Sequence, residues 1–182
     1  MIPLETLNYW LALGAIVLQL VTLYILVEHF FLKEKYVTPY LHRFGLHIVF
    51  LVSAAAALLT LVYSEVFGFI PCGLCWMERV FLYPIAIISL VALYKLRHGA
   101  RDTAVADYGI ALSGIGAVIA TYHHYLQMGG SALIACPTAG EGVDCAKRVI
   151  FEFGYVTFPL MAAIVFAFII MTLLVYRTGS RT

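Results

Sequence analysis

Five apolar windows constrain this sequence more than any other feature, because each is long enough to cross a lipid bilayer. They span about residues 9–30, 46–67, 74–94, 105–126 and 155–176. A membrane-spanning helix needs about 20 residues, and lipid offers no partner to an open backbone, so each window must be helical. The chain is 63% hydrophobic and 12% charged, whereas soluble domains are roughly half apolar and a quarter charged. We therefore predict an all-α membrane protein.

The first window has the place of a secretory signal peptide, but three features argue against cleavage. It is longer than the apolar region of a signal peptide, and no basic residue precedes it. The charged residues Lys33, Glu34 and Lys35 follow it, where a signal peptide has small residues. We expect this window to be retained as a transmembrane helix.

Basic residues lie mainly in the loops on one side of the expected helices, and the opposite side holds only Lys147 and Arg148. The first group comprises Lys33, Lys35, Arg43, Lys95, Arg97, Arg101, Arg177 and Arg181. Basic residues collect in cytoplasmic loops, so we expect a bacterial cytoplasmic-membrane protein with its N-terminus outside and its C-terminus inside. The net charge of +1 and the lack of a basic cluster argue against a nucleic-acid partner.

All four cysteines fall on the expected outer side, where disulfides persist. They are Cys72, Cys75, Cys136 and Cys145. Two disulfides that only staple the loops are one interpretation, and a zinc half-site at the C-x-x-C pair is a second. Eight residues separate Cys136 from Cys145, more than compact zinc sites use, and Trp76 stands where C-x-x-C-H haem attachment needs histidine. A redox-active pair that passes electrons to a second pair is the remaining interpretation.

The residues around the C-x-x-C pair favour the redox interpretation. Pro71 suits a helix start, which places both sulfurs near the first turn, where the helix dipole and free N–H groups stabilise a thiolate. Arg79 lies one turn after Cys75 on the same face, and its cation would favour the thiolate and polarise a carbonyl oxygen of a bound oxidant. The other interpretation of Arg79 is a side chain that reaches to the interface. Glu78 is expected to be solvated or paired rather than catalytic.

The segment FIPCGLCWMERVFLYP, residues 69–84, resembles the motif of the DsbB family of membrane disulfide bond formation proteins, especially its short Gram-positive BdbC-like type. The resemblance continues through HHYLQ, residues 123–127, and DCAKRVIFEFGYVTFP, residues 144–159, and covers about residues 45–176. The loop cysteines follow the C-x-x-C pair here, whereas in the related vitamin K epoxide reductases they precede it.

The resemblance implies a four-helix thiol oxidase bundle over residues 45–182. Residues 1–44 would add an N-terminal transmembrane helix and a cytoplasmic loop, which have no assigned role. The implied activity is that of a membrane thiol:quinone oxidoreductase. Its partner would be a secreted thioredoxin-like, DsbA-like dithiol oxidase, which it reoxidises. The electrons would go to a membrane quinone, either ubiquinone or menaquinone.

The resemblance also implies roles for the four cysteines by position. Cys136 would be attacked by the thiolate of the partner, and Cys145 would be its mate in the loop. Cys72 would exchange with the loop pair, and Cys75 would face the quinone. Four cysteines permit three pairings, and the residues themselves do not choose among them.

Three residues are assigned to the quinone by resemblance: Cys75, Arg79, which matches the motif arginine, and His124, which matches a family histidine near that site. No metal is implied. For the six histidines, an interfacial side chain with satisfied hydrogen bonds is the default. Only His29 and His47 match in depth as a pair of haem ligands, and they are distant from every cysteine.

Two other functions stay open: a non-enzymatic membrane scaffold with structural disulfides, and a quinone reductase like the vitamin K epoxide reductases. Small residues in the window 105–126 are interpreted as a helix-packing face. They are Gly109, Ser113, Gly114 and Gly116.

Overall fold

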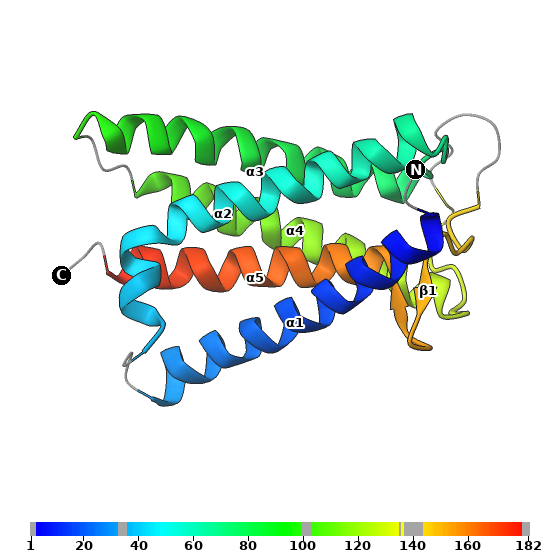
Figure 1. Cartoon of the computed structure of the whole chain (residues 1–182), viewed down its shortest axis with the longest axis horizontal. Coiled ribbons are helices and arrows are strands. Elements are labelled where there is room, and N and C mark those ends of the chain that lie inside the picture. The colour runs from blue at the N-terminus through cyan, green and yellow to red at the C-terminus, as the bar shows by residue number, and fades with distance from the viewer. Residues whose placement is uncertain (1–2, 33–35, 100–102, 135, 137–143, 180–182) are drawn as a thin grey trace.

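Five long helices, all within the residues that the structure describes, run side by side in the computed structural model (Figure 1). The described residues are 3–32, 36–99, 103–134, 136 and 144–179. The helices are α1 (Leu4–Phe31), α2 (Thr38–Leu61), α3 (Gly73–Arg97), α4 (Ala104–Gln127) and α5 (Phe158–Thr178). Each is long and apolar enough to cross a membrane. The prediction of an all-α, multi-pass membrane protein is confirmed.

Shorter elements lie at the end of the bundle where the chain begins. A π-helix of five residues, η1 (Val62–Val66), continues α2. Strands β1 (Phe151–Glu152) and β2 (Val156–Thr157) form an antiparallel hairpin before α5. Thr157 is the N-cap of α5, because its hydroxyl accepts a hydrogen bond from the Leu160 N–H at 3.3 Å. The apolar windows predict neither the π-helix nor the hairpin.

Helix α2 begins at Thr38, well before residue 46, where the apolar window opens. The N–H groups of its first residue and of the two residues before it are bound by a side chain of another helix. The Glu28 carboxylate of α1, which is 0% exposed, accepts hydrogen bonds from the backbone N–H groups of Tyr36, of Val37 at 2.8 Å and of Thr38 at 3.3 Å. An acid at a helix N-terminus satisfies open donors and complements the helix dipole, so α1 supplies the cap that the start of α2 lacks.

Helix α5 is the centre of the bundle and packs against α4, α2 and α1. Glycines on α4 permit the closest of these contacts. A Cβ added at Gly109 would lie 2.5 Å from Leu173 Cδ1, and one added at Gly116 would lie 2.5 Å from the Phe166 ring. The packing face is therefore confirmed at these glycines. Gly114 is not part of it, because an added Cβ there would meet nothing within 4 Å.

Helix α1 packs against α5 and makes few contacts with α2 (Figure 1). Ile25 of α1 is 1% exposed and joins Leu41, Phe168 and Val175 in a buried cluster near the end where α1 finishes. Near its beginning, Asn8 is 8% exposed and accepts a hydrogen bond from the Tyr63 hydroxyl. Helix α1 is thus fixed to the rest of the bundle at both ends.

The two termini lie at opposite ends of the bundle (Figure 1). The cysteine-bearing segments share the end where the chain begins, at the start of α3 and after α4. Four of the basic residues used to predict orientation lie toward the other end: Arg43, Lys95, Arg97 and Arg177. The other four lie outside the described residues: Lys33, Lys35, Arg101 and Arg181.

The two histidines whose depths match contact neighbours on their own helices. The His29 ring lies edge-on to Phe30, with 5.0 Å between the centroids, and the His47 ring lies edge-on to Phe44, with 6.1 Å between the centroids. His47 is exposed. Nothing in these contacts brings the two rings together as a pair of haem ligands.

Candidate functional site

The C-x-x-C pair forms the start of α3. Cys72 is the N-cap, with extended backbone angles of φ −69° and ψ 171°, and α3 begins at Gly73. Pro71 therefore lies just before the N-cap, outside the first turn. The Cys72 Sγ accepts a hydrogen bond from the Cys75 N–H at 3.2 Å, and Cys72 and Cys75 are joined as a disulfide. Both sulfurs lie at the positive end of the helix, as the sequence predicts.

The loop disulfide joins Cys136 to Cys145, which resolves the pairing among the three that the cysteine count allows. Cys145 is 1% exposed and Cys72 is 4% exposed, and both belong to one buried cluster with Leu74 and Leu126. Cys75 and Cys136 are only partly buried and pack against the same cluster. The two disulfides thus share one packed region, and each has an inner and a more accessible sulfur.

His123, from the end of α4, lies between the two disulfides. It is 1% exposed. Its Nε2 is 3.1 Å from the backbone oxygen of Cys145 and 3.7 Å from the Cys72 Sγ. Its Nδ1 is 2.8 Å from Glu78 Oε1. The side chain amide of Gln127 lies 3.4 Å from the same Nε2.

The His123–Glu78 pair holds a proton at a buried site next to a sulfur. A carbonyl oxygen only accepts, so His123 Nε2–H donates to the Cys145 carbonyl. The proton between His123 Nδ1 and Glu78 Oε1 then belongs either to the ring, which makes an ion pair, or to the carboxyl, which makes a neutral pair. Glu78 is 5% exposed. Of the two expectations for this residue, solvated or paired, the structure therefore matches the second.

Arg79 is buried on the other side of Glu78, with 7% of its surface exposed. Its Nη2–H donates to the Thr60 carbonyl at 2.9 Å, and its Nη1–H donates to the Ser64 hydroxyl at 3.3 Å. The guanidinium carbon lies 5.3 Å from the centroid of the Trp76 ring. Both acceptors lie where α2 passes into η1, and π-helical turns often occur at functional sites. These contacts hold the guanidinium inside the bundle.

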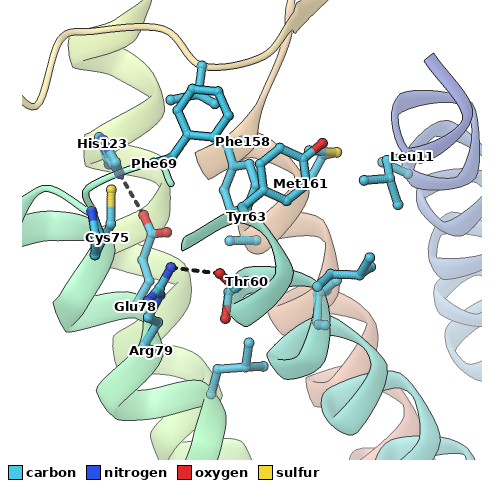
Figure 2. A pocket seen from close by; sticks show the side chains of 18 of the residues that line it. Leu11, Thr60, Tyr63, Phe69, Cys75, Glu78, Arg79, His123, Phe158 and Met161 are labelled. Carbon is cyan, nitrogen blue, oxygen red and sulfur yellow. Dashed lines mark hydrogen bonds and ion pairs between the residues drawn. The ribbon is translucent and has the colours of Figure 1, made fainter. Parts of the chain in front are cut away.

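A cavity of about 540 Å³ opens beside these groups, which is within the range of roughly 300–1,000 Å³ of small-molecule sites. Figure 2 shows Cys75, Glu78, Arg79 and His123 along one side of it and Leu11 of α1 across from them. These four side chains therefore form a polar end of the cavity, and Gln127, Asp144 and Lys147 line it as well. The rest is mainly apolar and includes Leu11, Ala15, Ala56, Leu59, Met161 and Val165.

Cys72, Cys75 and His123 offer ligand atoms that all lie within 4.8 Å of one another. Zinc in such a site is bound by cysteine thiolates, and the disulfide bond between Cys72 and Cys75 consumes both of them. The oxidised pair is therefore not a zinc half-site.

The structure brings together Cys72, Cys75, Cys145 and Arg79, with Cys136 at the margin, but it places His124 elsewhere. The His124 Nδ1 lies 2.8 Å from the Thr157 hydroxyl at the start of α5, and His124 is not among the residues that line the cavity. The histidine at the cavity is its neighbour, His123. The sequence held a signal for it: Gly109, Ser113, Gly116, Ala120, His123 and Gln127 follow the spacing of one helix face, and all are buried.

Known proteins match most of this chain. The family model described as "Disulfide bond formation protein DsbB" matches residues 42–176. The chain is 39% identical over 132 residues to the SPbeta prophage-derived disulfide bond formation protein B of Bacillus subtilis, covering 72% of this chain and 84% of that protein. It is 35% identical over 128 residues to disulfide bond formation protein C of the same organism, covering 69% and 87%.

A relative outside the bacilli also matches most of the chain. A probable disulfide formation protein of Metapseudomonas resinovorans is 34% identical over 135 residues, which are 74% of this chain and 89% of that protein. No solved structure shows a significant match. The matched residues contain both disulfides and the cavity wall formed by α2 to α5, and they exclude α1. The chain therefore belongs to the DsbB family, is of the BdbC-like type, and is a membrane protein of disulfide bond formation.

Proposed function

We propose that this protein is a thiol:quinone oxidoreductase that reoxidises a secreted DsbA-like dithiol oxidase and passes the electrons to a membrane quinone. One observation carries the proposal: the Cys72–Cys75 disulfide packs against the loop disulfide on one side and lines an amphipathic cavity on the other. In the proposed orientation, the cysteines and the N-terminus face outward and the C-terminus faces the cytoplasm. Two disulfides at two depths then connect a water-soluble donor to a lipid-soluble acceptor.

Electrons enter at the loop disulfide. Cys136 is only partly buried, whereas Cys145 is 1% exposed, so Cys136 offers the sulfur that a soluble partner reaches. A partner thiolate attacks the Cys136 Sγ, the Cys136–Cys145 bond breaks, and Cys145 leaves as a thiolate. The second thiol of the partner then attacks the partner sulfur of the mixed disulfide. This step releases an oxidised partner and leaves Cys136 and Cys145 reduced by two electrons.

The second exchange passes these electrons to the C-x-x-C pair. The Cys145 thiolate attacks the Cys72 Sγ in their shared cluster, and the Cys72–Cys75 bond breaks to leave a Cys75 thiolate beside the cavity. Cys136 then attacks Cys145, which restores the loop disulfide and releases Cys72. His123 Nε2, at 3.7 Å from the Cys72 Sγ, lies where it can stabilise that leaving thiolate or protonate it. Nε2 gives its hydrogen to the sulfur, and the proton shared with Glu78 is left on Nδ1, so the imidazole ends neutral.

The cavity suits a quinone because its polar end combines a sulfur with cationic and N–H donors, and the remainder is mainly apolar. When bound there, a quinone supplies an acceptor for two electrons and two protons. Arg79 uses two of its five N–H donors on Thr60 and Ser64. Its remaining donors are positioned to orient a carbonyl oxygen next to Cys75.

Turnover of the purified chain tests the relay. With a reduced DsbA-like protein and ubiquinone or menaquinone analogues, we expect quinone reduction that stops in Cys75→Ser. With the oxidised partner in place of the reduced one, we expect the free Cys136 thiolate of Cys145→Ala to attack the disulfide of the partner and trap a mixed disulfide, visible on a non-reducing gel. Quinone reduction that persists in Cys75→Ser would refute the relay. A wild-type protein that turns over with neither quinone would instead favour the alternative function, a non-enzymatic membrane scaffold with structural disulfides.

The proposed orientation has its own test. Glu65 and His98 are exposed at opposite ends of the bundle. In a cysteine-free background, Glu65→Cys should react with a membrane-impermeant maleimide in whole cells, and His98→Cys should react only after the cells are lysed. The reverse pattern would place the disulfides inside.

A further inference from the structure

The cavity extends beyond the part of the chain that matches the DsbB family. Its far wall is α1, which precedes residue 42, the first that the family model matches. Leu11, Gly14, Ala15 and Leu18 all line it, and their spacing of three, four and seven residues places them on one helix face. In Figure 2, the Leu11 side chain points from α1 into the space opposite Cys75.

Specific contacts hold α1 in this position. Asn8 is buried and accepts a hydrogen bond from the Tyr63 hydroxyl. Tyr63 is 2% exposed and itself lines the cavity. The Tyr9 ring lies 5.5 Å from the ring of Phe153, in the loop of the β1–β2 hairpin. A buried polar pair inside an apolar bundle fixes which face of α1 turns inward.

Helices α1 and α2 both line the cavity but make few contacts with each other. Ala56 and Leu59 of α2 face it from one side, and Ala15 and Leu18 of α1 face it from the other. All four are apolar. A molecule with its polar ring beside Cys75 would therefore extend an apolar chain between these two helices, toward the surrounding lipid.

We propose that α1 is a binding element for the isoprenoid chain of the quinone, and that Gly14 keeps the passage between α1 and α2 open. The ring binds to groups of the DsbB-like core, and the chain lies against the inward face of α1. This inference rests on the proposed quinone activity and deepens it, because it makes the substrate class a quinone with a long apolar chain. The expected boundary between residues 1–44 and the four-helix bundle of residues 45–182 would then not be a boundary of the binding site, because both parts would bind the quinone.

Gly14→Leu tests this assignment with little risk to folding. A Cβ at Gly14 would meet nothing within 4 Å, and leucine is a better helix former than glycine. Gly114→Leu on α4 is the matched control. Gly114 is also a helical glycine whose added Cβ would meet nothing within 4 Å, and it does not line the cavity.

Equilibrium binding is read from quenching of the two tryptophans, since Trp10 lines the cavity and Trp76 lies against Arg79. The probes are decylubiquinone against the same ring without a chain, and phylloquinone against menadione. In Gly14→Leu, we expect the ratio of the dissociation constants, with chain to without chain, to rise about tenfold, and we expect Gly14→Ala to give a smaller rise. Gly114→Leu should keep the wild-type ratio.

Two results would overturn the assignment of α1. One is a wild-type ratio in Gly14→Leu, and the other is an equal rise of the ratio in Gly114→Leu. A wild-type protein that binds neither the ring nor the ring with a chain would instead refute the quinone activity itself. The two failures are therefore distinguishable.

Discussion

Replacement of Arg79 by lysine tests the proposed quinone-binding end of the cavity most directly. The substitution keeps the positive charge and removes the planar guanidinium group. The guanidinium donates to Thr60 at 2.9 Å and to Ser64 at 3.3 Å through different nitrogens and lies 5.3 Å from the Trp76 ring centroid. A lysine ammonium is a compact charge on a flexible aliphatic chain and lacks the planar, fixed arrangement of N–H donors of a guanidinium. It can keep one of these contacts but not the set that fixes the direction of the remaining donors.

The expected loss is one charge-assisted hydrogen bond to a carbonyl oxygen of the quinone. Such bonds contribute about 1.5–3 kcal/mol, and about 1.4 kcal/mol corresponds to a tenfold change in affinity. We therefore expect Arg79→Lys to raise the apparent KM for quinone at least about tenfold. The rate of exchange between the partner and the loop disulfide should change less, because Arg79 contacts neither Cys136 nor Cys145 among the described residues.

Two variants serve as controls in the same steady-state assay, with quinone and reduced partner varied separately. Ser64→Ala removes the longer of the two Arg79 hydrogen bonds, together with the contacts of the Ser64 hydroxyl with the Thr60 and Leu61 carbonyls, and should give a smaller rise in KM. Arg43→Lys alters an arginine 5.2 Å from the Phe44 ring centroid, a comparable aromatic contact away from the cavity, and should change nothing. An unchanged quinone KM in Arg79→Lys, or an equal slowing of partner oxidation, would refute the role of Arg79.

Three further predictions separate chemistry from stability. Glu78→Gln cannot share a proton with His123, so we expect single-turnover reduction of the C-x-x-C disulfide to slow by about a hundredfold, with an unchanged quinone KM; equal effects on both would contradict the proton role. Thr157→Ala removes the α5 cap and the contact of the Thr157 hydroxyl with His124, which should cost about 1–2 kcal/mol and lower the Tm in detergent while turnover is retained. Gly116→Ala places a Cβ 2.5 Å from the Phe166 ring, and this overpacking should cost about 1–3 kcal/mol; an unchanged Tm would contradict the close approach of α4 and α5.

The sequence predicts the spans well because lipid leaves the backbone few choices. Helix boundaries are less predictable where a side-chain cap, and not the extent of the apolar window, determines the first residue of the helix. Helix α2 starts before its apolar window because Glu28, on a different helix, caps it. Helix α3 starts after Pro71 because the Cys72 sulfur caps it. Both caps depend on one side chain, which an average over a window does not register.

The site is predicted in part for a similar reason. The cysteines are identified by spacing and by the side of the membrane they share, and Arg79 by its position one turn after Cys75. The choice between His123 and His124 depends on which face of α4 turns inward, and adjacent residues on a helix point about 100° apart. Their immediate neighbours look alike in sequence. The buried face that runs through Gly109 and Gly116 decides for His123.

The contacts of α1 with the other helices could not be predicted from the sequence. Asn8 and Tyr63 are 55 residues apart, and neither belongs to a recognisable motif. Asparagine in an apolar helix indicates a polar partner but does not say which one. The cavity is likewise lined by residues of all five helices, and no periodicity in a single window encodes it.

The carboxylate of Glu28 has a consequence for attempts to shorten this protein to its family-matched core. Cutting the chain before residue 42 would remove a helix, the first turn of α2 and the acid that accepts its N–H groups. The backbone N–H groups at the new start of α2 would then have no acceptor from Glu28. A minimal four-helix version is therefore expected to require a transplanted cap. A chain that begins near residue 36 and carries Val37→Asp, which supplies a side-chain acceptor at the N-cap position, is the natural starting design.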